Sequence, residues 1–376
     1  MFFSTDKLIY MYMIVCFCMM GFNIAYIFYK KSSDGFIKKR SEKLRKRIDC
    51  QLFMNDAYTL KLSKHKKMLL KKLKKVNNLM AFDEAIDQYN GEKKKEIYRY
   101  IKSIRDVFCD LAPIYNRKSN IKKAYFAYIM SKYKISQGVK SDRIISTMFE
   151  FLEEKSIYCR ENALKALYSF GNAQNVIKAL KIINVNNVFY SKEVLTFGLT
   201  SFNGNHEELA EELWNNFENF EEKMQLAIID YLGMVSKKYK ERLYNLLIRE
   251  DTSKNIKVSI IYYFEKNVYE PIKEILINYL ELAGIENLEY ALASAEVLRK
   301  YPGIDTINSL KHAIHSRNWK VRVKASESLA YLNVQYIELA EIYNGTDRVA
   351  REILQYKVKK RLGNMRKKDN SLTEVS

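Results

Sequence analysis

Hydrophobic residues follow two different patterns along the chain. Near the N-terminus, residues 8–29 form a run without a single charged side chain. A helix of that length spans roughly 33 Å, enough to cross a hydrocarbon core of about 30 Å. A signal peptide would have a shorter apolar core followed by a cleavage site of small residues, whereas Lys30 and Lys31 follow this run directly. We therefore predict one uncleaved transmembrane helix.

The second pattern begins near residue 155 and repeats. In each repeat, a small or aliphatic residue stands three positions after a starting residue, and a large apolar residue stands seven positions after it. The starting residues lie 31 to 34 positions apart: Arg160, Lys192, Met224, Lys257, Ala291 and Arg322. Most repeats also contain a second apolar stripe, so each one predicts a pair of short antiparallel helices. Stacked pairs of this length form a helical solenoid.

The scarcity of turn residues favours an all-helical chain. The sequence has only 3 prolines and 12 glycines, whereas an all-β or doubly wound α/β protein needs many more turns. Residues 83–150 are also helical by pattern, although they do not follow the repeat period. The 5 cysteines include no CxxC pair, which argues against a disulfide framework or a structural zinc site and favours a reducing compartment.

Two of the repeats resemble a known family. The sequences RENALKAL (160–167) and VRVKASESL (321–329) are similar to the first helix of HEAT repeats of the PBS-lyase-like type. The predicted fold class is therefore all-α, a HEAT-like α-solenoid preceded by a single N-terminal transmembrane helix. The whole layout resembles the membrane-anchored HEAT-repeat proteins of low-GC Gram-positive bacteria. That resemblance implies a protein partner among the membrane glycosyltransferases of polysaccharide synthesis or their regulators.

These patterns divide the chain into six predicted parts. They are a transmembrane helix (8–29), a basic juxtamembrane helical neck (30–82), a helical N-terminal part of the solenoid (83–150), HEAT-like repeats (151–345), a C-terminal capping helix (346–364) and a disordered tail (365–376). The capping helix ends in a basic, polar face, as the last helix of a solenoid requires.

Positive charge is concentrated directly after the apolar run. The formal net charge is +20, and residues 30–75 alone hold 17 Lys or Arg against four acidic residues. Because basic residues flank a transmembrane helix on its cytoplasmic side, we predict a single-pass cell-membrane protein with its bulk in the cytoplasm. Lipid headgroups are always present at that boundary, so the charge favours anionic lipid over nucleic acid. The candidate lipid-binding residues are Lys30, Lys31, Lys38, Lys39, Arg40, Lys43, Arg45, Lys46 and Arg47.

The sequence contains no recognisable catalytic or cofactor motif. It has neither a phosphate-binding P-loop nor a glycine-rich dinucleotide loop. His312 and His315 are three residues apart and could supply two metal ligands on one helix, but they lie beside an apolar stripe and no cysteine is close. We therefore predict no catalytic residue, no cofactor and no metal site, and a protein that is not an enzyme.

Three residues of the repeats are candidates either for binding a partner or for packing one repeat against the next. They are Arg160, Trp319 and Arg322. In HEAT repeats, the arginine at this position commonly hydrogen-bonds the neighbouring turn. We predict a non-catalytic scaffold that binds a protein partner at the cytoplasmic face of the membrane. Two other functions stay open, which are nucleic-acid binding by the repeats and anionic-lipid binding through the basic neck.

Overall fold

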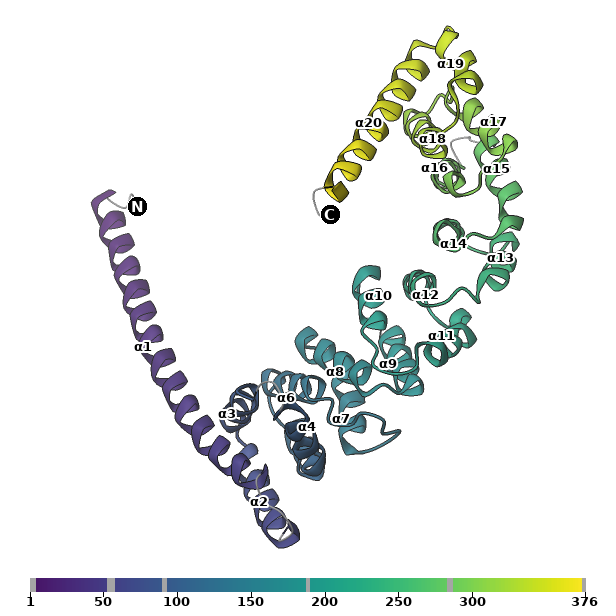
Figure 1. Cartoon of the computed structure of the whole chain (residues 1–376). Coiled ribbons are helices and arrows are strands. Elements are labelled where there is room, and N and C mark those ends of the chain that lie inside the picture. Colours follow the sequence, from purple (N-terminus) through teal and green to yellow (C-terminus); the bar gives the residue numbers. More distant parts are fainter. Residues whose placement is uncertain (1–4, 53–57, 90–92, 187–189, 283–286, 374–376) are drawn as a thin grey trace. The chain divides into compact units, whose positions relative to one another are not determined.

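The computed structural model describes residues 5–52, 58–89, 93–186, 190–282 and 287–373. These residues form helices joined by turns, with no strand among them (Figure 1). The predicted all-α helical-repeat fold with one apolar N-terminal helix is therefore confirmed. The chain forms two compact units: unit 1 contains Met1–Val188 and Ser201–Asn205, and unit 2 contains Phe189–Thr200 and His206–Ser376.

Helix α1, Thr5–Leu52, is one continuous helix of 48 residues (Figure 1). Its segment Tyr10–Ile27 is long and apolar enough to cross a membrane, with a mean hydropathy of 1.7, and none of it is buried. Its C-terminal end packs on α3, Val76–Asp87, by burying Leu44 and Ile48. The predicted boundary between the anchor and the neck therefore falls inside a single helix. The hydrophobic pattern changes there, but nothing in the chain breaks the backbone hydrogen bonding.

The remaining helices of unit 1 alternate between two rows. Helix α6 packs on α8, while α2 packs on α5 and α5 on α7. Their bounds are α2 Tyr58–Leu73, α4 Lys93–Ser103, α5 Arg105–Asn116, α6 Asn120–Lys132, α7 Arg143–Leu152, α8 Ile157–Phe170 and α9 Ala173–Val185. Residues 83–150, which do not follow the repeat period, thus pack in two rows of helices, as helices α8 and α9 of the repeats do. Their spacing differs because a longer connection, residues 133–142, joins α6 to α7.

A close backbone approach holds the end of α8 in unit 1. Gly171 has a left-handed backbone (φ +75°) and ends α8. A Cβ at this position would collide with the carbonyl oxygen of Asn203. The Asn203 backbone N–H donates to the Tyr168 carbonyl at 3.0 Å. Only glycine satisfies both the conformation and the available space.

Unit 2 consists of repeated helix pairs. Helices α10, α12, α14, α16, α18 and α20 pack successively on one another, and α15 packs on α17 in the second row. The bounds are α10 Lys192–Thr200, α11 His206–Asn215, α12 Glu222–Val235, α13 Lys240–Ile248, α14 Lys254–Lys266, α15 Lys273–Glu281, α16 Leu288–Val297, α17 Ile304–Ala313, α18 Trp319–Leu332, α19 Ala340–Asn344 and α20 Arg348–Thr373. Short 3-10 turns lie at Phe217–Asn219, Glu270–Ile272, Leu298–Lys300 and Tyr336–Leu339.

Burial explains why the repeat pattern could be found in the sequence. In all six repeats, the side chains three and seven positions after the starting residue are at most 3% exposed. The small residue at the first position, such as Ala227 or Ala325, allows neighbouring helices to approach closely, and the larger residue seven positions on fills the core. The period therefore records which side of each first helix faces the next pair.

The last helix is longer than the predicted cap. Helix α20 buries Ala350 and Leu354 and packs on α18. It continues to Thr373, through most of the segment predicted as a disordered tail. Lysine and arginine in this segment are good helix formers, so Gly363 does not end the helix. Residues 374–376 lie outside the described residues.

Candidate functional surfaces

Charged side chains of the repeats form ion pairs from one helix to the next. On the α11–α13 row the partners are regularly 31 residues apart: Lys238 with Glu207 at 2.9 Å, Arg242 with Glu211 at 3.0 Å, and Arg249 with Glu218 at 2.7 Å. The other row continues this arrangement: Arg299 pairs with Glu265, Lys324 with Glu296 at 2.7 Å, and Lys357 with Glu327 at 2.6 Å. The repeats thus neutralise much of their own charge.

Arg160 bonds to the turn that precedes its helix. Its guanidinium donates to the carbonyl oxygens of Glu154 and Lys155 at 2.7 and 2.9 Å. Ser156 occupies the N-cap position of α8, but its side chain makes no capping hydrogen bond. The turn is therefore held by the Arg160 guanidinium, which bonds its carbonyl groups, and not by a capping bond from Ser156.

Arg322 connects the turn before α18 to the start of α20. It donates to the Ser316 carbonyl at 2.6 Å and forms an ion pair with Asp347 at 2.9 Å. Asp347 also accepts hydrogen bonds from His315 at 2.9 Å and from the Ala350 backbone N–H at 3.0 Å. The bonds from His315, Ala350 and Arg322 hold the pKa of Asp347 well below its usual range. The side-chain bonds of Arg322 therefore fasten one helix pair to the next.

Trp319 is the first residue of α18 and is 60% exposed. An exposed tryptophan is a suitable anchor for a partner because it buries a large area and loses little conformational entropy. Trp319 is therefore a better candidate for partner binding than Arg160 and Arg322, because both guanidinium groups are already bonded to other groups of the chain.

The basic residues of α1 face solvent. All the candidate lipid-binding side chains from Lys31 to Arg47 are exposed, and the Lys30 side chain lies outside the described side chains. Arg45 is partly engaged, since it donates to Gln88 at 3.0 Å. Among the described residues, the only ion pair that uses a basic residue of 30–75 is Lys66 with Asp106, at 3.0 Å.

Part of this charge acts between α1 and α2. Lys39, Lys43 and Arg47 are spaced four residues apart and so follow one side of α1. The pKa of Lys72 on α2 is lowered first by partial burial and then by the charges of Arg47 and Lys43. We call these four residues the basic face. None of them forms an ion pair with a described residue.

A buried histidine lies beside the basic face. His65 of α2 is 7% exposed, and its Nε2 is 2.8 Å from the Tyr100 hydroxyl. Burial, together with the charge of Arg47, lowers its pKa to about 4. His65 is therefore neutral at physiological pH and adds no charge to the basic face.

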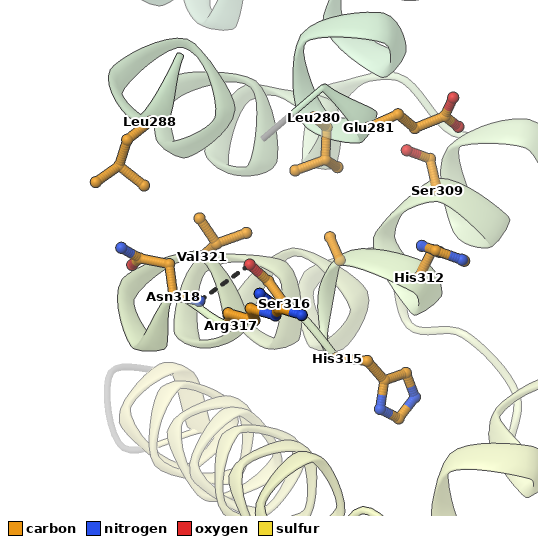
Figure 2. A pocket seen from close by; sticks show the side chains of 11 residues that line it. Leu280, Glu281, Leu288, Ser309, His312, His315, Ser316, Arg317, Asn318 and Val321 are labelled. Atoms are coloured by element: carbon orange, nitrogen blue, oxygen red, sulfur yellow. Dashed lines mark hydrogen bonds between the residues drawn. The ribbon is translucent and has the colours of Figure 1, made fainter. Parts of the chain in front are cut away.

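A cavity of about 830 Å³ opens among α15, α16, α17 and α18 in unit 2 (Figure 2). It is lined by Leu280, Glu281, Leu288, Ser309, His312, Ala313, His315, Ser316, Arg317, Asn318 and Val321. Figure 2 shows the His315 ring directed away from Ser309 and Glu281, and this ring is bonded to Asp347. No group of three or more potential metal ligands occurs among the described residues. The cavity therefore offers mixed polar groups without a convergent reactive set.

The sequence did not reveal Lys72, His65 or Asp347 as notable residues. The run of eight lysines without an acid from Lys61 to Lys75 is visible in the sequence. Its proximity to Lys43 and Arg47 depends on the reversal of the chain between α1 and α2, which no local motif encodes. Asp347 could have been found as an N-cap, because aspartate before a helix is a common start signal.

Comparisons with known proteins give no relative that identifies this chain. No family model matches the sequence, and no curated protein matches it. Human deoxyhypusine hydroxylase in complex with glycerol is similar over 79% of this chain and 95% of its own, with 14% identity and a TM-score of 0.27. The designed armadillo repeat protein YIII(Dq)4CqI covers 66% of this chain and 98% of its own, with 16% identity and a TM-score of 0.19. Such low scores carry no argument about function, and the PBS-lyase-like HEAT type stays a prediction from the motifs.

Proposed function

We propose that this chain is a non-catalytic, membrane-anchored scaffold that holds a protein partner at the cytoplasmic face of the membrane. The observation that carries the proposal is the continuity of α1. One end of this helix is apolar and wholly exposed, and the other end buries Leu44 and Ile48 against α3. The packed helices of unit 1 thus continue directly from the apolar segment, because α1 has no break between Ile27 and Leu44.

The repeats supply a large surface for such a partner. Stacked helix pairs present extended faces that bind proteins without needing a deep cavity. Large exposed aromatic residues, including Phe197 on α10 and Trp319 on α18, are available on unit 2. Aromatic side chains of this kind often dominate the energy of a protein interface. Confinement to the membrane would raise the effective concentration of both partners.

The charge distribution argues against nucleic-acid binding by the repeats. Residues 151–376 contain 32 Lys or Arg and 30 Asp or Glu. Many of these charges are already paired across helices, as in Lys324 with Glu296. Nucleic-acid affinity comes largely from neutralising phosphates with an excess of cations, whereas the positive and negative charges of residues 151–376 nearly balance.

Anionic lipid is a second candidate ligand, limited to the start of the cytoplasmic part of α1. Lys31 is exposed and, at 1.5 Å per residue, lies about 6 Å along the helix from Ile27. It therefore falls within the headgroup layer, where a basic residue gains about 1 kcal/mol from anionic lipid. This contact would reinforce the orientation of the anchor rather than replace the scaffold function.

Capture of the tagged full-length protein from gently solubilised membranes, with cross-linking and mass spectrometry, tests the scaffold. We expect a specific membrane protein cross-linked to residues 151–345. The resemblance stated above makes a membrane glycosyltransferase the first candidate. The variant Trp319→Ser should weaken capture, whereas the exposed control Lys320→Ser should not. Recovery of lipid or nucleic acid without a protein would contradict the proposal.

The orientation has a separate test. Cys50 near the end of α1 is exposed, whereas Cys159 is buried. A membrane-impermeant maleimide should leave Cys50 unlabelled in intact cells and label it after permeabilisation, with Cys50→Ser as the control. Labelling of Cys50 in intact cells would place the repeats outside the cell and exclude a cytoplasmic scaffold.

A further inference from the structure

The cavity among α15, α16, α17 and α18 lies beside Trp319, the exposed residue that the scaffold proposal assigns to a partner. Asn318, which precedes Trp319 in the chain, lines the cavity. The cavity volume of about 830 Å³ is typical of sites that hold drug-sized ligands. Leu280, Leu288 and Val321 contribute apolar side chains, which we call the apolar wall (Figure 2). The cavity can therefore take an aliphatic group.

A buried hydroxyl group without a partner faces the cavity. Ser309 on α17 is 4% exposed and lines the cavity, and its Oγ has no hydrogen-bond partner among the described residues. Figure 2 shows this hydroxyl turned toward the side of the cavity that Leu280 forms. Burying a hydroxyl without a hydrogen bond is unfavourable. A ligand that presents an acceptor to Ser309 would remove this penalty.

Position distinguishes Ser309 from other buried hydroxyl groups. Ser259, Ser294 and Thr306 also have a hydroxyl without a partner in the described part of the chain, but none of them lines the cavity. An unpartnered hydroxyl is therefore not by itself evidence of a ligand. At Ser309 it coincides with space for one. Ser259 on α14, which is 7% exposed, is a matched control.

The start of α18 gives one end of the cavity a positive potential. The first N–H groups of a helix have no partner within that helix and carry partial positive charge. Asn318 occupies one of them, since its side chain accepts from the Lys320 N–H at 2.9 Å. Arg317 lines the cavity directly before this helix end. Because a guanidinium can donate two parallel hydrogen bonds to a carboxylate, this end of the cavity favours a carboxylate.

The negative charge in the cavity wall lies on another helix. Glu281, the last residue of α15, is the one acidic residue among the described lining residues, and it is exposed. His315 does not neutralise it, because Figure 2 shows the ring directed away from Glu281 and this ring is bonded to Asp347. A ligand carboxylate therefore has to lie at the α18 end. Near Glu281 we expect the ligand to present a hydrogen-bond donor such as a backbone N–H.

We propose that the cavity binds the C-terminal residues of the protein partner. The terminal carboxylate lies at the start of α18 beside Arg317, an aliphatic side chain packs against the apolar wall, and a backbone carbonyl accepts from Ser309. The inference rests on the proposed scaffold function and names the part of the partner that is held. A chain terminus fits the cavity better than an internal loop, which has no backbone carboxylate, or a free fatty acid, which has no amide.

A pair of peptides that differ only at the terminus tests the site. Full-length protein in nanodiscs of zwitterionic lipid is titrated with a fluorescein-labelled Gly-Ala-Gly-Ala-Leu peptide that ends in a free carboxylate, and with the same peptide ending in an amide. We expect the free acid to bind at least about tenfold more tightly, because it alone carries a charge for the α18 end. Absence of binding, or equal affinity for the two peptides, overturns the proposal.

Single substitutions then assign the binding to named groups. Ser309→Ala should weaken binding of the free acid at least about fivefold without lowering the melting temperature, since the lost hydroxyl has no partner among the residues that the structure describes. The control Ser259→Ala removes a similar hydroxyl outside the cavity and should change affinity less than about twofold. Arg317→Gln should weaken binding of the free acid and leave the amide unchanged. Equal effects of Ser309→Ala and Ser259→Ala contradict the proposal.

Competition and membrane capture separate the remaining alternatives. If octanoate displaces the labelled free acid as effectively as the unlabelled peptide does, the cavity serves a free aliphatic acid and the proposal is wrong. In membrane capture, the double variant Ser309→Ala, Arg317→Gln should recover less of the partner than the wild type. If both recover it equally well, the docking site is wrong while the scaffold stands. If the wild type captures no protein, the scaffold itself fails, and the docking site with it.

Discussion

Helices α1 and α20 both pack on helices of the fold and both carry exposed lysines, but they are held in different ways. Helix α20 packs on α18 and pairs Lys357 with Glu327, while its Lys359 and Lys360 are exposed and form no ion pair with a described residue. Helix α1 packs on α3 by burying Leu44 and Ile48, and none of its basic residues forms an ion pair with a described residue. The comparison shows that α1 is held by apolar packing alone, whereas α20 adds ion pairs to its packing. Exposed, unpaired lysines occur on both helices and do not by themselves indicate a ligand.

Packing, and not charge, should hold α1 against the repeats. Replacing Ile48 with alanine removes a fully buried side chain from the contact with α3. We expect a loss of about 2–4 kcal/mol in the stability of unit 1. The exposed neighbour change Lys46→Ala should alter stability by less than about 0.5 kcal/mol. Hydrogen exchange of α3 in the full-length protein measures both effects. A larger effect at Lys46 than at Ile48 would mean that charge and not apolar packing holds α1 on α3, which would contradict the comparison with α20.

Protonation of His65 should destabilise the region of the basic face. The folded state holds the pKa of His65 at about 4, below the ordinary value of 6.5. The unfolded chain therefore takes up a proton first as the pH falls, so stability is complete above pH 6.5 and decreases between pH 6.5 and 4. The full loss corresponds to about 3 kcal/mol. Thermal unfolding from pH 7 to pH 4, compared with His65→Gln, measures it. An identical pH dependence in the variant would refute the assignment to His65.

Shortening a paired arginine should cost more than removing an unpaired lysine. Arg322→Lys keeps the charge but cannot bond Ser316 and Asp347 together with the same planar group. We expect a loss of about 1–2 kcal/mol in the stability of unit 2, against no measurable loss for Lys39→Gln in unit 1. Differential scanning calorimetry of the full-length variants provides the measurement. Equal losses of stability would show that paired and unpaired basic residues contribute equally to the fold.

The fold was largely predictable because burial follows the sequence period. The positions of Ala163 and Leu167, and their equivalents in the other five repeats, are buried wherever the pattern places them. In the predicted neck, apolar residues recur at helical spacing from Leu62 to Met80, but this pattern was less informative. Helix α2 ends at Leu73 and α3 starts in a new phase, so Leu79 is buried while Met80 is 37% exposed. A hydrophobic stripe does not reveal a turn that contains neither glycine nor proline.

The candidate surfaces could be predicted only in part. The exposed lysines of α1 follow from composition and position, and Trp319 follows from its place at the start of a helix. The basic face does not, because Lys72 joins Lys43 and Arg47 only after the chain reverses. Arg322 shows the opposite case. Its place in the repeat motif was visible, but its partner Asp347 lies 25 residues further along the chain, directly before α20.

The most direct test compares two sets of three neutralised cations in the full-length protein. Lys43→Gln, Arg47→Gln, Lys72→Gln removes unpaired charge, and Arg299→Gln, Lys324→Gln, Lys357→Gln removes paired charge. In zwitterionic nanodiscs without a partner, the first set should leave the melting temperature unchanged or raise it, because repulsion is relieved. The second should lower it by several degrees, since each lost pair contributes about 0.5–1 kcal/mol. A comparable fall in melting temperature for the first set would contradict the account, because the cations of the basic face would then contribute to stability as much as the paired cations do.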